Sequence, residues 1–399
     1  LEFANGGVEF SNGGVSSVGT ITGNGGNLTV SNGTLSVANK MTLTGGNLTV
    51  NGTLNVSDVL SATGGNVSGT GTLNLANGGT FTTGSGYNNA LNKLIVGGTT
   101  TLLSASTIEA LEFSKAAEVK ISDSLKAETV STVNGAILSG DTLMLTGTGT
   151  FVKDSVKTDV LALLSGARAV FAGDNSLTNL SMIGNASAVI NAGATLTLAQ
   201  DSVGAADSVI TGAGTLALNK DGLTVNALLS NLGKLAVSQS ATLGNTAQVG
   251  TLDIANGTLT QNADVTAGTV SFGSNGKLTV NGGKTLNITR SITAGAGMLN
   301  GAGTINLSGG ANGAFATGVS FKDGRLIVGA GTASFTGNTT MASVDFTGDD
   351  GRLNIESGNT LTLAKIATKA SNTVTGAGTL RLSGTGSTFN APIVSLGEI

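Results

Sequence analysis

The 399-residue chain contains no Cys, no His and no Trp, and it has a single Tyr and a single Pro. The absence of Cys and His excludes a Ser-His-Asp triad, a thiol nucleophile, a zinc site built from the usual ligands, and a haem held through either residue. A disulfide framework is excluded for the same reason. We expect a protein without enzymatic activity and without a cofactor. We also expect the one tyrosine, Tyr87, in a surface loop.

Charge and apolar runs are equally limited. Nineteen Lys and Arg residues stand against 23 Asp and Glu residues, which gives a formal net charge of −4. A broad phosphate-binding surface is not expected, and nucleic acid is not an expected partner. The longest nearly apolar stretch, 160–173, is interrupted by Arg168 and is shorter than the ~18 to 20 residues that a membrane-spanning helix needs. We expect that the given chain does not insert into a membrane.

The sequence is rich in glycine and contains an internal repeat. The chain has 63 Gly residues, and the sequence GGNLTV occupies positions 25–30 and again positions 45–50. In both copies Leu and Val alternate with Thr or Asn. Alternation with a period of two places the apolar side chains on one face of a β-strand and the hydroxyls and amides on the other. The repeat therefore predicts short strands that each have one buried face.

Two further templates recur along the chain. One places two glycines before a strand, as in 68–75 (SGTGTLNL), 211–218, 300–307 and 375–382. The other has an apolar residue, any residue and Phe, followed by a turn that usually contains Gly and by a further strand. We interpret the Phe side chains of this template as one inward column that fills a corner of the core. These residues are Phe10, Phe113, Phe272, Phe321 and Phe346.

Asn-Gly pairs, among them Asn32-Gly33 and Asn256-Gly257, punctuate the strands. Both residue types accept positive φ at low cost, as a sharp corner requires. Asn-Gly is also the strongest hairpin signal, so an antiparallel meander is the alternative fold. We prefer a coil, because one coil with a constant turn accounts for the regular spacing of the repeat, whereas many short hairpins would have to close into several barrels or sandwiches.

The sequence therefore predicts an all-β protein, a parallel β-helix (β-solenoid) with about 20 residues per turn. One turn loses about 20 to 40 kcal/mol of backbone entropy, and roughly five buried side chains return only about 1.5 to 3 kcal/mol each, so turns must stack on one another. We expect residues 1–399 to form one continuous solenoid. Since the chain begins without Met or an apolar secretory segment, we expect a fragment of a longer secreted polypeptide.

Residues 99–134 differ from the rest of the chain. They contain no Gly and carry a mixture of acidic and basic residues. A helix is one interpretation of this subregion. The alternation in 118–122 (EVKIS) favours strands with outward charges and tighter corners instead.

Candidate site residues are few. Asp345, Asp349 and Asp350 could hold Ca²⁺ through oxygen atoms, but their spacing matches neither the helix-loop-helix calcium loop nor the calcium-binding nonapeptide repeat, and a polar corner is the simpler interpretation. No catalytic residue is assigned. We interpret the Asn-x-Ser/Thr triplets as products of composition rather than as glycosylation sites. These triplets include Asn27, Asn47, Asn66, Asn185, Asn287 and Asn338.

Several segments resemble a known group of proteins. GGNLTVSNGTLSV (25–37), TGAGTLAL (211–218) and ESGNTLTLAK (356–365) are similar to the repeats of Gram-negative autotransporter passengers and of filamentous-haemagglutinin-like surface proteins. The resemblance covers essentially the whole chain. It implies a right-handed parallel β-helix that is exported through two membranes and is displayed or released as an adhesin, biofilm factor or toxin-like passenger. It implies a secreted or cell-surface location.

The expected function is that of a non-enzymatic, elongated extracellular scaffold whose Thr, Ser and Asn surface mediates adhesion or self-association. The expected partners are further copies of the chain or molecules on host or neighbouring cells. Many weak contacts between polar ladders would sum through multivalency. The outward positions selected for this surface are Thr29, Thr49, Asn55, Thr279 and Asn354.

Two alternatives remain open. The chain could be the subunit of a surface filament or layer, joined end to end through exposed strand edges. It could also be a polysaccharide lyase or hydrolase on the same coil, because such enzymes work with clustered carboxylates, for which Asp349 and Asp350 are candidates.

Overall fold

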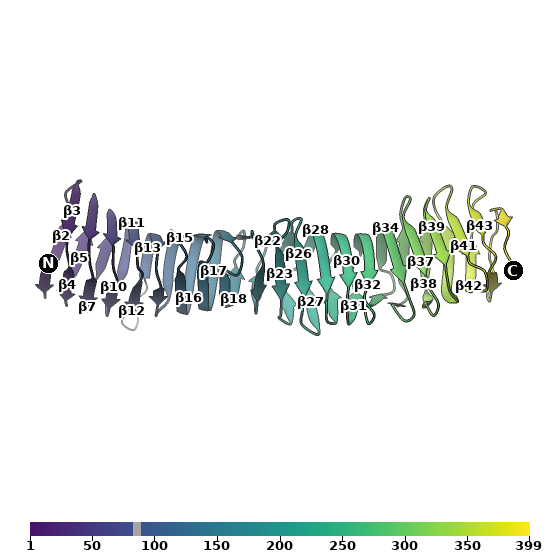
Figure 1. Cartoon of the computed structure of the whole chain (residues 1–399), viewed down its shortest axis with the longest axis horizontal. Coiled ribbons are helices and arrows are strands. Elements are labelled where there is room, and N and C mark those ends of the chain that lie inside the picture. The colour runs from purple at the N-terminus through teal and green to yellow at the C-terminus, as the bar shows by residue number, and fades with distance from the viewer. Residues whose placement is uncertain (83–88) are drawn as a thin grey trace. The chain divides into compact units, whose positions relative to one another are not determined.

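The computed structural model describes residues 1–82 and 89–399, so Tyr87 lies outside the described residues. The chain divides into two compact units, Leu1–Leu198 and Ala199–Ile399. The described residues form β-strands and no helix, which confirms the all-β prediction (Figure 1). Each unit is a stack of turns, and the prediction that 1–399 form one continuous solenoid stays a prediction.

The first unit contains short strands and a few long ones. Its strands are β1 (Glu2–Ala4), β2 (Gly7–Phe10), β3 (Val15–Val18), β4 (Ile21–Asn24), β5 (Asn27–Val30), β6 (Thr34–Val37), β7 (Met41–Thr44), β8 (Leu48–Val50), β9 (Thr53–Val56), β10 (Leu60–Thr63), β11 (Val67–Leu75), β12 (Gly79–Thr82), β13 (Asn89–Val96), β14 (Thr100–Leu102), β15 (Ser106–Phe113), β16 (Glu118–Ser131), β17 (Ile137–Phe151), β18 (Val156–Leu163), β19 (Arg168–Phe171), β20 (Asn175–Leu177), β21 (Leu180–Met182), β22 (Ser187–Ile190) and β23 (Thr195–Leu198).

Each turn at the start of the first unit consists of three strands on three different faces. Strand β1 pairs with β4, β2 with β5 and β3 with β6, and all three pairings are parallel. Asn32-Gly33 joins β5 to β6, which pair with β8 and β9 rather than with each other. The antiparallel meander is therefore wrong, and the parallel solenoid is confirmed.

Apolar side chains stack in columns inside the first unit because the step between paired residues is almost constant. Leu28 pairs with Leu48 of the next turn, and Leu48 pairs with Val67 of the turn after that. All three side chains are at most 1% exposed. Stacking at the usual strand spacing of about 4.8 Å lets each turn bury the apolar face of its neighbour, which one turn alone cannot do.

The two-glycine template marks a corner where the backbone of one turn lies against the next. Gly69, Gly301 and Gly376, the first glycines of three copies, have φ of +136°, +100° and +110°. A Cβ at Gly69 would lie 2.0 Å from the carbonyl oxygen of Val50, and one at Gly376 would lie 2.0 Å from that of Ile355. Only glycine fits both this conformation and this contact.

The charged subregion 99–134 is built from β14, β15 and β16, so strands rather than a helix are confirmed there. Val119 and Ile121 are buried and Lys120 between them is exposed. The charges of this subregion therefore project outward from an unbroken apolar core.

The second unit is built in the same way. Its strands are β24 (Ser202–Val203), β25 (Val209–Thr211), β26 (Thr215–Leu218), β27 (Leu223–Val225), β28 (Leu228–Val237), β29 (Ala241–Leu243), β30 (Ala247–Ile254), β31 (Thr258–Gln261), β32 (Val265–Phe272), β33 (Lys277–Val280), β34 (Thr285–Ala294), β35 (Leu299–Asn300), β36 (Thr304–Leu307), β37 (Asn312–Phe315), β38 (Ser320–Val328), β39 (Thr332–Phe335), β40 (Thr339–Phe346), β41 (Arg352–Ile355), β42 (Thr360–Ala367), β43 (Thr373–Thr375), β44 (Thr379–Leu382) and β45 (Ile393–Val394).

The step between turns is less regular in the second unit. Leu252 of β30 pairs with Val270 of β32, which is a short step, and Val270 pairs with Ile292 of β34, which is a longer one. Six strands, β24, β27, β29, β31, β33 and β35, form one parallel face. The two units together contain about 20 turns of about 19 residues each.

The prediction that five Phe side chains form one inward column is wrong as to the column, whereas Phe113, Phe321 and Phe346 are buried as predicted. Phe113 pairs with Val96 and Phe346 with Val328, whereas Phe321 lies near the start of its strand and pairs with Met341. Variable steps place the same template at different positions of the turn. The rings that do pack together come from other positions. Phe151 and Phe171 are tilted, with 5.8 Å between ring centroids, and Phe315 and Phe335 are stacked, with 5.2 Å between ring centroids.

Candidate functional site

The outward faces carry ladders of short polar side chains. On one face of the first unit Glu9, Thr29, Thr49 and Ser68 occupy paired positions of β2, β5, β8 and β11. Thr29 and Thr49 are half-buried and flanked on their own strands by buried apolar residues. Both predicted residues therefore lie in one outward ladder.

Asn55 belongs to a ladder on a different face of the same unit. Ser36, Asn55 and Asn74 occupy paired positions of β6, β9 and β11. The side-chain amide of Asn74 donates to Oδ1 of Asn55 at 3.3 Å. Stacked amides of this kind link one turn to the next as well as facing outward.

The two remaining predicted positions lie in the second unit on separate faces. Thr279 of β33 pairs with Thr260 and Asn300, and Asn354 of β41 pairs with Ser334 and Thr375. All five predicted residues are thus outward, and the structure does not gather them into one patch. Any surface that they form is distributed over several ladders.

Asparagine side chains at corners are used to join turns. Oδ1 of Asn27 accepts a hydrogen bond from the backbone N–H of Asn47 at 3.0 Å, and Oδ1 of Asn47 accepts one from Asn66 at 3.0 Å. Oδ1 of Asn338 likewise accepts from the backbone N–H of Thr360 at 2.7 Å. These amides satisfy backbone donors, which gives Asn27, Asn47 and Asn338 a structural role.

The three candidate calcium ligands are not brought together. Asp345 forms an ion pair with Arg325, at 2.6 Å between Oδ2 and Nε. Asp349 accepts a hydrogen bond from the hydroxyl of Ser371 at 3.0 Å, and Asp350 is exposed with φ of +62°. Across residues 1–82 and 89–399, no group of three or more acidic side chains is placed to hold a metal ion.

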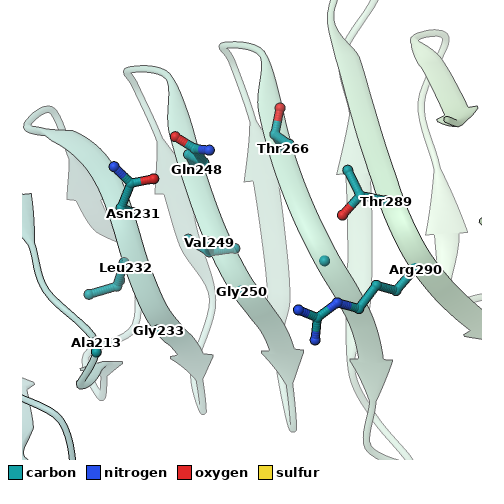
Figure 2. A pocket seen from close by; sticks show the side chains of 11 residues that line it. Ala213, Asn231, Leu232, Gly233, Gln248, Val249, Gly250, Thr266, Thr289 and Arg290 are labelled. Carbon is teal, nitrogen blue, oxygen red and sulfur yellow. The ribbon is translucent and has the colours of Figure 1, made fainter. Parts of the chain in front are cut away.

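A groove that sequence reasoning missed crosses strands β28, β30, β32 and β34 of the second unit. It is open to solvent, with a volume of about 370 Å³. Gly233, Gly250 and Gly268 line it at the bend of three successive strands, where Gly250 is exposed, Gly233 is half-buried and Gly268 is buried. Figure 2 shows Asn231 projecting from β28 and Gln248 projecting from β30. The guanidinium of Arg290, on β34, reaches back across β32.

Arg290 is placed over the groove by a bulge. Ala267 pairs with Ile288 and Thr269 pairs with Ser291, so that Thr289 and Arg290 stand opposite the single residue Gly268. A bulge bends its strand and re-aims a side chain. A Cβ at Gly268 would lie 3.7 Å from Nε of Arg290, which shows how closely the Arg290 side chain lies against this buried glycine.

The lysine nearest the groove is paired, whereas Arg290 is not. Nζ of Lys234 lies 2.6 Å from Oδ2 of Asp253, and Ser271 also donates to this carboxylate at 3.0 Å. The hydrogen bond from Lys234 lowers the pKa of Asp253, against a smaller opposing effect of burial. Among the described residues no acidic side chain pairs with Arg290. The recurrence of Gly at one bend position is the sequence signal that could have indicated this groove.

In comparisons with protein families, curated proteins and solved structures, no match to the chain is found. Within the part of the chain that the structure describes, no helix is long and apolar enough to span a membrane.

Proposed function

We propose that the chain is an extracellular, non-enzymatic scaffold of the autotransporter-passenger or filamentous-haemagglutinin type, which acts in adhesion or self-association through its outward ladders. The observation that carries the proposal is the ladder of Glu9, Thr29, Thr49 and Ser68, in which polar side chains repeat once per turn above a buried apolar core. The resemblance of the repeats to those surface proteins supports the location.

The mechanism follows from the shape of a ladder. Short hydroxyl and amide side chains stand at a spacing of about 4.8 Å, each able to donate and to accept a hydrogen bond. Two copies that meet along such ladders make many equivalent weak contacts, and together these give an affinity that no single contact provides. The strand faces do the binding, and no catalytic group is required.

The experiment introduces two opposite charges into one ladder, so that the net charge of the ladder stays the same. In the double variant Thr29→Lys with Thr49→Glu the two new charges lie on paired positions, and the new ammonium group also lies opposite Glu9, so the turn is expected to fold. We expect at least a tenfold weaker self-association by sedimentation velocity over a concentration series. Thr107→Glu is the matched control, because Thr107 pairs with Lys126 in a ladder that is already charged.

Unchanged self-association after the further substitutions Asn55→Lys, Thr279→Lys and Asn354→Lys would contradict the proposal. Electron microscopy of the same samples separates lateral pairing from end-to-end filaments, since only filaments show an axial repeat. Depletion of added polysaccharide by the wild-type chain, abolished in Asp349→Asn with Asp350→Asn, would instead indicate an enzyme.

A further inference from the structure

The groove at Arg290 differs chemically from the ladders. It follows one bend of the solenoid over four successive turns, from Asn231 and Gly233 through Gly250 and Gly268 to Arg290. At the usual strand spacing this corresponds to about 14 Å, long enough for an extended ligand. An extended ligand lying along the bend would contact each turn in succession.

The side chains around the groove are free to bind. Among the described residues, the amides of Asn231 and Gln248 have no hydrogen-bond partner, and both side chains are exposed. Each amide offers two donor hydrogens and an acceptor oxygen. Neighbouring hydroxyl groups on one ligand would match these amides, because a hydroxyl also donates and accepts.

Within the described part of the chain, Arg290 supplies the only cation without an acidic partner around this groove, because Lys234 beside it is held by Asp253. A guanidinium binds a carboxylate through two parallel hydrogen bonds, which fixes orientation as well as charge. Asp264, in the hollow next to the groove, accepts a hydrogen bond from the backbone N–H of Thr285 at 2.8 Å. The anion-binding end of the groove is therefore the end at Arg290.

We propose that this groove binds an extended polysaccharide that carries carboxylate groups, with Arg290 on a carboxylate and Asn231 and Gln248 on ring hydroxyls. At Gly233 and Gly250 a sugar ring can approach the backbone without meeting a Cβ. A peptide is disfavoured, because the strands at this bend are already paired with the turns on both sides and present no open sheet edge. The proposal rests on the proposed function in one respect only, the location of the protein at a surface where it can encounter such polysaccharides.

The test measures binding of hexagalacturonate to the full chain by isothermal titration calorimetry, at a concentration where the chain is monomeric by sedimentation. Charge-assisted hydrogen bonds of this kind contribute enough that Arg290→Gln is expected to weaken binding about 10- to 100-fold. Arg290→Lys keeps the positive charge but loses the two parallel hydrogen bonds of the guanidinium, and it is expected to give an intermediate affinity. Arg352→Gln, at an exposed arginine on β41, is the matched control and is expected to bind as the wild type does.

Three probes decide the ligand class. Hexagalacturonate should bind, its fully methyl-esterified form should bind at least tenfold more weakly, and hexaglutamate should not compete. Equal binding of the methyl ester, effective competition by hexaglutamate, or wild-type affinity in Arg290→Gln would overturn the proposal. So would the absence of binding to hexagalacturonate, alginate and hyaluronate at millimolar concentration. None of these outcomes depends on self-association, which is measured separately with the double variant Thr29→Lys and Thr49→Glu.

Discussion

Strands β15 in the first unit and β30 in the second have the same design and different surfaces. Each has eight residues, and the order of buried, half-buried and exposed positions is identical in the two strands. The fourth residue, at the bend, is Glu109 in β15 and Gly250 in β30. One backbone path can therefore carry either a charged ridge or a hollow, depending on the side chain at the bend.

The likeness extends to the neighbouring strands. Lys93 reaches Glu112 of β15 at 2.8 Å, and Lys234 reaches Asp253 of β30 at 2.6 Å. In both cases the acid is the seventh residue of its strand and the lysine lies on the preceding turn, diagonally opposite. The ion pairs thus belong to the shared design, whereas the glycines at the bend and Arg290 belong to the groove alone.

The largest effect is expected in the shared core. Leu111 and Leu252 are the sixth residues of β15 and β30, and both are fully buried between a Leu of the preceding turn and a Val of the next. Leu111→Ala and Leu252→Ala should each lower the free energy of unfolding by about 2 to 5 kcal/mol, through lost burial and the cavity left behind. Hydrogen exchange of the two strands measures each cost locally. A difference above about 1 kcal/mol would contradict a common core.

A smaller effect should separate the two bends. A Cβ at Gly250 would lie 2.7 Å from the carbonyl oxygen of Gly233, so Gly250→Ala forces a backbone shift that should cost about 1 to 3 kcal/mol. Glu109→Ala removes exposed atoms and one exposed hydrogen bond, which the side-chain amide of Asn92 donates to the carboxylate, and should change stability by less than about 0.5 kcal/mol. Urea midpoints of the two variants test the difference. Equal costs would show that the glycine at the bend is not required by packing.

The smallest effect concerns the paired lysines. Because the pKa of Asp253 is lowered in the folded chain, its ion pair stabilises above the ordinary Asp value of about 3.9, and this stabilisation is lost as pH falls through the lowered pKa. Lys234→Gln should raise the pKa of Asp253 and cost less than about 1 kcal/mol near pH 7, because the pair is partly exposed. NMR titration of the Asp253 carboxyl measures the shift. An unchanged pKa in this variant would show that Lys234 does not cause the lowered pKa of Asp253.

Period-two alternation and glycine corners were enough to predict the strands, the inward rows and the outward ladders. Leu28, Leu48 and their neighbours repeat with a step that the sequence displays directly. The charged subregion also followed from alternation, since Glu118 and Lys120 flank a buried Val119. Local pattern is sufficient in these places because each strand contacts the equivalent strands of adjacent turns.

The groove could not be predicted in the same way. The bulge at Thr289 and Arg290 arises because β34 has one residue more than β32 between paired positions, and that count is defined only once the strands are aligned. The Phe column failed for a related reason, because steps of unequal length move one template to different places in the turn. Pairing partners such as Arg325 for Asp345 depend on the same alignment.

The corner asparagines make the chain tolerant of changes in length that are counted in turns. Oδ1 of Asn27 accepts a hydrogen bond from the backbone N–H of Asn47, and Oδ1 of Asn47 accepts the equivalent bond from Asn66. Excising residues 28–47 would therefore let Asn27 accept the hydrogen bond from Asn66 that Asn47 now accepts. Removing half as many residues would instead rotate every later side chain to the wrong face. Insertion or deletion of whole turns therefore lets such a chain change its number of turns while it keeps its core.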